Sequence, residues 1–165
     1  MKPIIVYGDI TAIEKLEVFD PQALNSVSQC VNCMGVMGRG LALSIKNKHP
    51  IVYSEYMSIC NKNKNNRSNL LGHVQPVSVN ELTTYCNIFG QYNYGTDKRQ
   101  VNYEAVFQAL EYQAEVAKNT PHMDFYYPLN MGAGLAGGTW AVIESMITSL
   151  FSDLPNKVYF VNFSK

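Results

Sequence analysis

Short apolar runs alternate along the chain with stretches in which apolar residues recur every three or four positions. The short runs are typical of buried strands, and the longer periodic stretches are typical of helices that bury one face. We expect strands over 4–7, 28–33, 73–79, 83–89, 125–127 and 158–163. We expect helices over 40–48, 52–60, 102–116 and 139–151, and polar loops over 61–69 and 92–100.

This order of elements contains no internal repeat and no linker long enough to separate two domains. It predicts one domain over residues 1–165, an α/β sandwich with helices on both faces of a mixed sheet. Asn102 and Thr139 stand where helix N-caps are expected. The last helix is expected to bury Val142, Ile143, Met146, Ile147 and Leu150.

Charge narrows the range of functions. The 165 residues include 13 Lys plus Arg and 13 Asp plus Glu, which gives a formal net charge of zero. A neutral chain does not attract nucleic acid by bulk charge, so nucleic-acid binding is not expected. No apolar run approaches the ~20 residues of a membrane span, and residues 1–7 show no signal-peptide pattern. We therefore expect a cytoplasmic monomer that does not associate with membranes.

The four cysteines do not indicate a metal or redox site. Cys30 and Cys33 form a C-x-x-C pattern, but they fall in an expected strand, where residues three apart face opposite sides. Zinc would need two further ligands, and Cys60 and Cys86 stand alone. Buried, reduced thiols are the interpretation that remains, with no metal and no cofactor expected.

Two glycine-rich segments carry the strongest chemical signal. The first glycine loop (35–40) and the second glycine loop (131–138) each leave a strand and enter a helix. Glycine lets the backbone approach a ligand closely, and the N–H groups at a helix N-terminus favour an anion. Two such loops predict a diphosphate held between them. The alternative, that these glycines only make tight turns, stays open.

Two familiar nucleotide folds are disfavoured. Gly132, Gly134 and Gly137 match G-x-G-x-x-G, but only one helix and one strand follow them, and Asp153 is misplaced for a ribose ligand. Neither loop is followed by Gly-Lys-Ser/Thr, so a P-loop is absent from the sequence.

The segments 8–11, 31–42 and 128–140 together resemble the macro domain family, in its order and at its usual spacing. Asn69 to Gly72 and Asn87 to Gln91 are similar to a branch of small stand-alone members that includes ADP-ribose-1''-phosphate phosphatases. The resemblance implies a three-layer α/β/α fold with a six-stranded mixed sheet. It also implies a cleft that binds ADP-ribose or ADP-ribose-1''-phosphate.

The resemblance also implies a role for each matching residue. Asp9 would accept a hydrogen bond from the adenine amino group, and Asn32 would bind the distal ribose; alternatively, Asp9 caps a turn and Asn32 only ends a strand. The implied ligand-binding set is Asp9, Ile10, Asn32, Gly35, Val36, Met37, Gly38, Gly40, Met131, Gly132, Ala133, Gly134, Leu135, Ala136 and Gly137, with Asn162 or Phe163 beside the adenine.

The departures from the family pattern concern catalysis. Gly90-Gln91 replaces the lysine of the glycohydrolases, Gln29 replaces a histidine of the phosphatase branch, and Thr139 replaces an aspartate. Asp97 is the best remaining carboxylate for acid–base work, and Asn32 could order a water that the substrate phosphate activates.

Three hypotheses follow: a phosphatase acting on ADP-ribose-1''-phosphate, an ADP-ribosyl hydrolase acting on modified macromolecules, and a module that binds ADP-ribose without chemistry. The phosphatase is the first choice on the branch resemblance, and the lost catalytic positions favour the third hypothesis.

Overall fold

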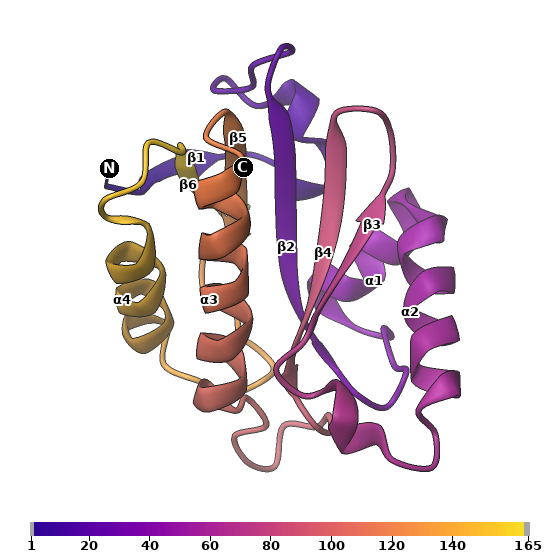
Figure 1. The fold of residues 1–165 in the computed structure, drawn as a ribbon. Coiled ribbons are helices and arrows are strands. Elements are labelled where there is room, and N and C mark those ends of the chain that lie inside the picture. Colours follow the sequence, from indigo (N-terminus) through magenta and orange to yellow (C-terminus); the bar gives the residue numbers. More distant parts are fainter. Residues whose placement is uncertain (1, 164–165) are drawn as a thin grey trace.

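One mixed sheet runs through the centre of the molecule (Figure 1). The structure is a computed structural model and describes residues 2–163. The six strands lie in the order β1-β6-β5-β2-β4-β3, and every neighbouring pair is parallel except β3 and β4. The strands are β1 (Ile4–Tyr7), β2 (Leu24–Asn32), β3 (Val74–Ser78), β4 (Thr83–Gln91), β5 (Met123–Pro128) and β6 (Val158–Asn162).

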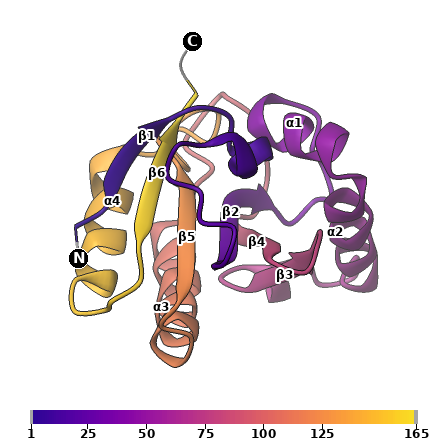
Figure 2. The ribbon, with the colours of Figure 1, turned by 90° about the horizontal axis from the view of Figure 1, so that it is seen from above.

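Helices cover both faces of this sheet (Figure 2). Helices α1 (Gly40–Lys48) and α2 (Pro50–Lys62) lie on one face. The 3-10 segments η1 (Ile10–Lys15) and η2 (Arg67–Leu70) precede and follow them along the chain. The opposite face carries α3 (Tyr103–Asn119) and α4 (Trp140–Phe151). The prediction of a three-layer α/β/α sandwich with a six-stranded mixed sheet is therefore confirmed. None of the helices in residues 2–163 is long and apolar enough to cross a bilayer.

Strand β5 shows how the two cores are built. Successive side chains of a strand point to opposite faces, so Phe125 and Tyr127 join the core under α3 and α4 while Tyr126 joins the core under η1 and α1. The buried hydroxyl of Tyr127 donates to Gln113 Oε1 at 2.7 Å, and Gln113 Nε2 donates to Ser28 Oγ at 2.8 Å. This network joins α3 to the two central strands.

The predictions for the start of β2 and for Val142 are wrong, and the N-cap position predicted for Thr139 is confirmed without a side-chain bond. Strand β2 begins at Leu24 and not at Ser28, because Asn25 and Ser26, which are polar in sequence, are buried between the flanking strands β4 and β5. Thr139 stands at the N-cap of α4 but its side chain makes no capping bond, whereas Asn102 caps α3 by accepting from Ala105 N at 3.0 Å. Val142, expected inside, is 37% exposed.

The short elements differ in smaller ways. Pro50 opens α2 directly after α1, since a proline at the first helical position loses no hydrogen bond. The expected loop over 61–69 contains the start of η2, and η1 had no periodicity that would have predicted it. Phe163 lies just beyond the end of β6 and is 76% exposed.

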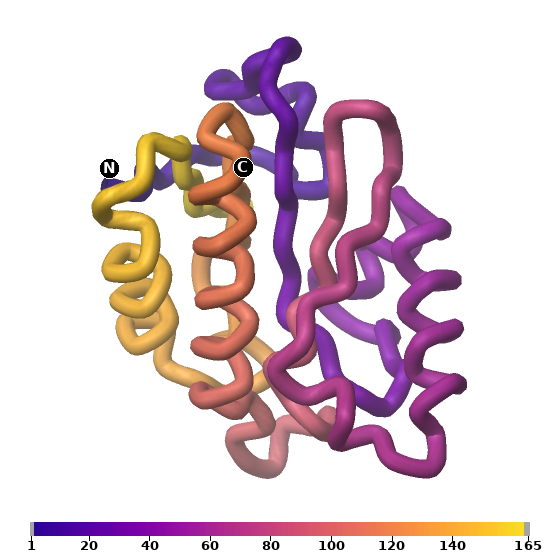
Figure 3. Tube along the Cα trace, viewed as in Figure 1, coloured from indigo at the N-terminus to yellow at the C-terminus, as the bar shows by residue number. Residues whose placement is uncertain are grey.

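The parallel arrangement brings several loops to one edge. Strands β2, β4 and β5 are mutually aligned, so the chain leaves all three at their carboxyl ends, on the lower edge in Figure 3. Both glycine loops and the 92–101 segment start there. In open α/β sheets, ligands bind outside the carboxyl ends of neighbouring strands whose connections diverge to opposite faces. Here β2 leads to α1 on one face, and its neighbour β5 leads to α4 on the other.

The packing assignment can be tested on α4. Ile147 is fully buried, so Ile147→Ala should lower the free energy of unfolding by about 2–5 kcal/mol, the usual cost of removing a buried aliphatic side chain. Val142→Ala on the same helix is the matched control and should cost less than about 1 kcal/mol, because Val142 is partly exposed. Urea unfolding measures both. Equal losses would contradict the assigned inner face of α4.

Candidate functional site: a cleft between two glycine loops

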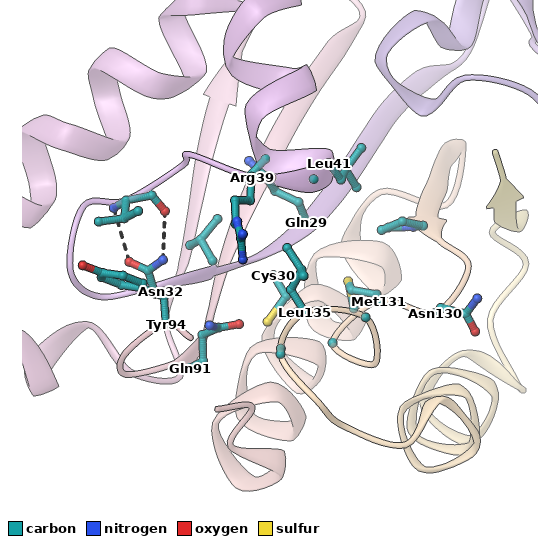
Figure 4. Close-up of a pocket in the computed structure, with 18 of the residues that line it drawn as sticks. Gln29, Cys30, Asn32, Arg39, Leu41, Gln91, Tyr94, Asn130, Met131 and Leu135 are labelled. Atoms are coloured by element: carbon teal, nitrogen blue, oxygen red, sulfur yellow. Dashed lines mark hydrogen bonds between the residues drawn. The ribbon is translucent and has the colours of Figure 1, made fainter. Parts of the chain in front are cut away.

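A cavity of about 620 Å³ opens at the carboxyl edge of the sheet (Figure 4). Its walls come from the end of β2, the start of α1, the segment 91–96 that leaves β4, and the segment 128–136 that leaves β5. The lining thus unites the two glycine loops that the sequence singled out. The two loops lie close together, since a Cβ built on Gly40 would lie 3.4 Å from Leu135 Cδ1.

The first glycine loop is shaped by two buried side chains. Asn32 Oδ1 accepts from Met34 N at 2.9 Å, and Asn32 Nδ2 donates to Val36 O at 2.8 Å. The Tyr56 hydroxyl, which reaches in from α2, accepts from Gly35 N and Val36 N at 3.1 Å each and lies 2.8 Å from Asn32 O and Oδ1. Burial raises the pKa of Tyr56, so its hydroxyl stays protonated and can donate to Asn32.

These bonds do not use the backbone N–H groups at the end of the first glycine loop, which can therefore bind a ligand. Within the described chain, no acceptor is present for the backbone N–H groups from Gly38 through Ala42, which begin α1 and line the cavity. Such N–H groups at the start of a helix, together with the helix dipole, form an anion site.

The second glycine loop also has backbone N–H groups that lack an acceptor among the described residues. Asn130 and Gly132 have positive φ angles of 68° and 75°, and Ala133 N donates to Asn130 O at 2.8 Å. A Cβ on Gly132 would be strained at this positive φ and would lie 2.6 Å from Ile143 Cδ1, so glycine is favoured at this position. The tight turns leave three successive N–H groups, those of residues 134–136, without an acceptor among the described residues, and all three residues line the cavity. Successive free N–H groups in such turns bind anions.

The charge of the cavity comes from one residue. Arg39 is the sole charged residue in the lining that residues 2–163 provide, and Figure 4 shows its side chain reaching from the start of α1 into the cavity. Its guanidinium has no acidic partner in the described chain. The cavity therefore combines one cation with two groups of unpaired N–H donors, which favours an anionic ligand.

The same lining is poor in acid–base groups. It contains no Asp, Glu, His or Lys contributed by the described residues. Cys30 lines the cavity, but burial raises the pKa of its thiol to about 12, so the nucleophilic thiolate is disfavoured near neutral pH. Gln91 Nε2 donates to Asn93 O at 2.8 Å and cannot act as a base. No group of three metal-ligating side chains was found in the part of the chain that the structure describes.

Most of the sequence-predicted loop residues line this cavity. They are Asn32, Val36, Gly38, Gly40, Met131, Gly132, Gly134, Leu135 and Ala136. Gly35, Met37, Ala133 and Gly137 lie outside the lining: the Met37 side chain is 2% exposed within the core, and Gly35 packs against Met57.

The residues predicted for the adenine lie beside the cavity and not in its lining. Asp9 lies just beyond the end of β1, and Asn162 is the last residue of the adjacent strand β6. The two strand ends are joined by the hydrogen bond from Gly8 N to Asn162 O at 3.0 Å. Asp9 Oδ1 caps η1 by accepting from Thr11 N and Thr11 Oγ1, which leaves Oδ2 of this exposed carboxylate available. The Ile10 side chain is buried in the core, and Phe163 is exposed.

Asp97, the predicted catalytic carboxylate, is not brought into the cavity. It is exposed, accepts from Gln100 Nε2 at 3.4 Å, and stands next to Thr96, which does line the cavity. The structure adds two residues that were not among the predicted site residues, Arg39 and Tyr56, and it places Gln29, noted above at the position of a missing histidine, in the lining. The position of Arg39 between two glycines was the available signal, whereas Tyr56 lies 24 residues from the Asn32 that it contacts.

Comparison with known proteins identifies the fold. No protein-family model matches the sequence, and no curated protein is detectably similar to it. Solved structures do match over the full chain. A Bacteroides thetaiotaomicron protein of unknown function is 24% identical, with a TM-score of 0.83 and 99% of each chain covered. A macrodomain protein from Streptomyces coelicolor is 26% identical, with a TM-score of 0.75, covering 98% of this chain and 99% of that one.

This chain has the macrodomain fold. A further solved structure, Thermosipho africanus DarTG in complex with ADP-ribose, is 19% identical with a TM-score of 0.72 over 96% of this chain and 41% of that chain. The resemblance seen in segments 8–11, 31–42 and 128–140 is thereby confirmed at the level of the fold.

The role of Tyr56 in shaping the first glycine loop can be tested by Tyr56→Phe. Losing the hydroxyl leaves Gly35 N without its partner, so the free energy of unfolding should fall by about 1–3 kcal/mol. Hydrogen exchange at the Gly35 and Val36 amides should speed up. Tyr53→Phe, which removes a hydroxyl without a hydrogen bond in the described chain, is the control and should leave both readouts nearly unchanged. Slow exchange in Tyr56→Phe would contradict the role.

Proposed function

We propose that this macrodomain binds ADP-ribose or an ADP-ribose derivative in the cleft between its glycine loops. One observation carries the proposal: two groups of backbone N–H donors, neither with an acceptor among the described residues, line one cavity together with Arg39, and no acidic residue of the described chain lines it. A diphosphate matches two donor groups better than a single phosphate does. A solved structure of the same fold, Thermosipho africanus DarTG, holds ADP-ribose.

The remaining parts of the ligand follow from the ends of the cleft. The distal ribose would lie toward Asn32 and the first glycine loop, and the adenine toward Asp9 and Asn162 at the ends of β1 and β6. A carboxylate such as Asp9 can accept only, so it favours adenine, whose amino group donates. Asn162 is the better adenine neighbour of the two candidates, because it belongs to β6 while Phe163 projects beyond it.

Hydrolysis of ADP-ribose-1''-phosphate is the second candidate. Arg39 favours it, because a terminal phosphate adds negative charge to the ligand and Arg39 is a cation in the lining. In this reaction a water oxygen attacks phosphorus and the bond from phosphorus to the distal ribose oxygen breaks. The absence of acid–base side chains from the described lining, however, favours slow turnover or binding alone, because phosphate monoesters need very large acceleration. ADP-ribosyl hydrolase activity is disfavoured as well, because this chain has Gln91 where such hydrolases are expected to carry a lysine.

Calorimetry with ADP-ribose, its 1''-phosphate, NAD and ATP tests the binding proposal. Gly134→Glu should weaken ADP-ribose binding at least about tenfold, because a Cβ there meets nothing within 4 Å and the new carboxylate faces the anion site. Gly134→Gln is the control for bulk and should lose less. Arg39→Gln should weaken binding by about 10–100-fold if the guanidinium contacts the anion. Full affinity in a folded Gly134→Glu protein would refute the two-loop site.

Release of inorganic phosphate from ADP-ribose-1''-phosphate tests the second candidate. Turnover that disappears in Arg39→Gln and persists in Asp97→Asn would support a phosphatase centred on the cavity, because Asp97 lies outside its lining. Loss of turnover in Asp97→Asn alone would restore the carboxylate as the catalytic group. Tight binding of ADP-ribose without phosphate release from the monoester leaves the protein as a binding module.

A further inference from the structure

One glutamine in the wall of the cavity has an oxygen that the protein does not use. Gln91 ends β4, lines the cavity and is only 9% exposed. Its Nε2 donates to the backbone oxygen of Asn93 at 2.8 Å. A backbone oxygen can only accept, so this bond fixes the orientation of the amide and turns Oε1 away from Asn93. Figure 4 shows the amide with its oxygen on the side of the cavity that holds Cys30 and Leu135.

This oxygen is both unpaired and accessible. No hydrogen bond from the described residues reaches Gln91 Oε1. Five buried side-chain atoms of the described chain lack a partner and are closed off from solvent, and Gln91 Oε1 is not among them. It therefore keeps surface that a bound molecule can touch. A ligand in the cavity excludes water from this oxygen, so the ligand has to supply a donor in place of the water or bind more weakly.

The neighbouring Asn32 cannot supply an acceptor. Asn32 is the register partner of Gln91 on β2, and both residues line the cavity. Three protein donors surround Asn32 Oδ1: Met34 N at 2.9 Å, the Tyr56 hydroxyl at 2.8 Å and Val36 N at 3.4 Å. An amide oxygen has two lone pairs, so it has no position left for a ligand. Asn32 Nδ2 gives one hydrogen to Val36 O and keeps the second.

The two side chains are therefore complementary for a hydroxyl group. A sugar hydroxyl both donates and accepts a hydrogen bond. Asn32 offers an N–H and Gln91 offers an oxygen, from the ends of adjacent strands. Gln29 is the third buried polar residue in the lining that the described residues provide, and its oxygen is one of the atoms closed off from solvent. Gln91 Oε1 is thus the fixed side-chain acceptor that a ligand can reach among these three.

We propose that Gln91 Oε1 is a specificity determinant that accepts a hydrogen bond from a hydroxyl of the distal ribose. The proposal rests on the proposed function, which places the distal ribose toward Asn32, and it names the part of ADP-ribose that the cavity distinguishes. A ligand with this hydroxyl pairs the oxygen. A ligand of the same shape without the hydroxyl displaces water and leaves the oxygen unpaired, which costs affinity.

Calorimetry with three ligands measures this selectivity. They are ADP-ribose, an analogue whose distal sugar ring carries no hydroxyls, and an analogue with hypoxanthine in place of adenine. The wild-type protein should bind ADP-ribose at least about tenfold more tightly than the hydroxyl-free analogue. The hypoxanthine analogue reports on the other end of the nucleotide, so changes at Gln91 should not alter its affinity relative to ADP-ribose.

The variants are Gln91→Met and Gln91→Lys. Methionine keeps the length of the side chain without the oxygen. Lysine keeps a donor for Asn93 O but has no acceptor, so it separates the contact with the ligand from the support of the segment after β4. The positive charge of lysine acts on the diphosphate of both ligands alike and cancels in their ratio. In both variants the preference for ADP-ribose over the hydroxyl-free analogue should fall at least about fivefold.

Gln100→Met is the matched control. It makes the same chemical change nine positions along the same segment, and Gln100 does not line the cavity. Its side chain donates to Asp97 Oδ1 at 3.4 Å. This variant should keep the full preference for ADP-ribose over the hydroxyl-free analogue.

Each result decides. Equal wild-type affinity for ADP-ribose and the hydroxyl-free analogue, or a preference that persists in either Gln91 variant, overturns the role of Gln91 and leaves the proposed function standing. A changed preference against the hypoxanthine analogue in these variants overturns the assignment to the distal ribose. A wild-type protein that does not bind ADP-ribose overturns the proposed function and this inference with it. Should the variants fail to fold, a crystal structure of the wild-type complex decides by whether a hydroxyl of the distal ribose lies within hydrogen-bond distance of Gln91 Oε1.

Discussion

Strand β2 is paired on both edges and covered on both faces, and nearly every polar side chain along it must find a partner inside the protein. Ser28 is paired through Gln113 with α3, and Gln29 is paired through Asn87 with β4. At its carboxyl end, Asn32 folds the chain that follows into the first glycine loop. The satisfaction of buried polar groups on this one strand thus connects the core of the protein to the walls of its cleft.

The cleft shows how a chain with no net charge can select an anion. The donors are backbone N–H groups whose positions are fixed by tight turns, by Tyr56 and by the packing of Gly132 against Ile143. A single guanidinium, from Arg39, adds the charge. Recognition of this kind depends on the orientation of the backbone N–H groups and not on the total number of lysines and arginines.

The sequence predicted the fold and much of the cleft because these features follow from local rules. Strand and helix periodicity placed every strand and long helix, and the two glycine loops marked both walls of the cavity. The start of β2 was missed because Asn25 and Ser26 are polar residues that only the neighbouring strands bury. Val142 was placed inside because an apolar stripe does not show how much of a helix face the rest of the protein covers.

By itself the sequence determined the order of the elements, the neutral charge and the presence of two glycine loops, since each is a property of neighbouring residues. Only the tertiary structure decided which atoms face the cleft. It brought Arg39 into the cavity, left Asp97 outside, joined Tyr56 to a loop 20 residues away, and linked Gln29 to Gln75 through Asn87. Such choices depend on hydrogen bonds between strands and helices distant in sequence, and no local pattern encodes their direction.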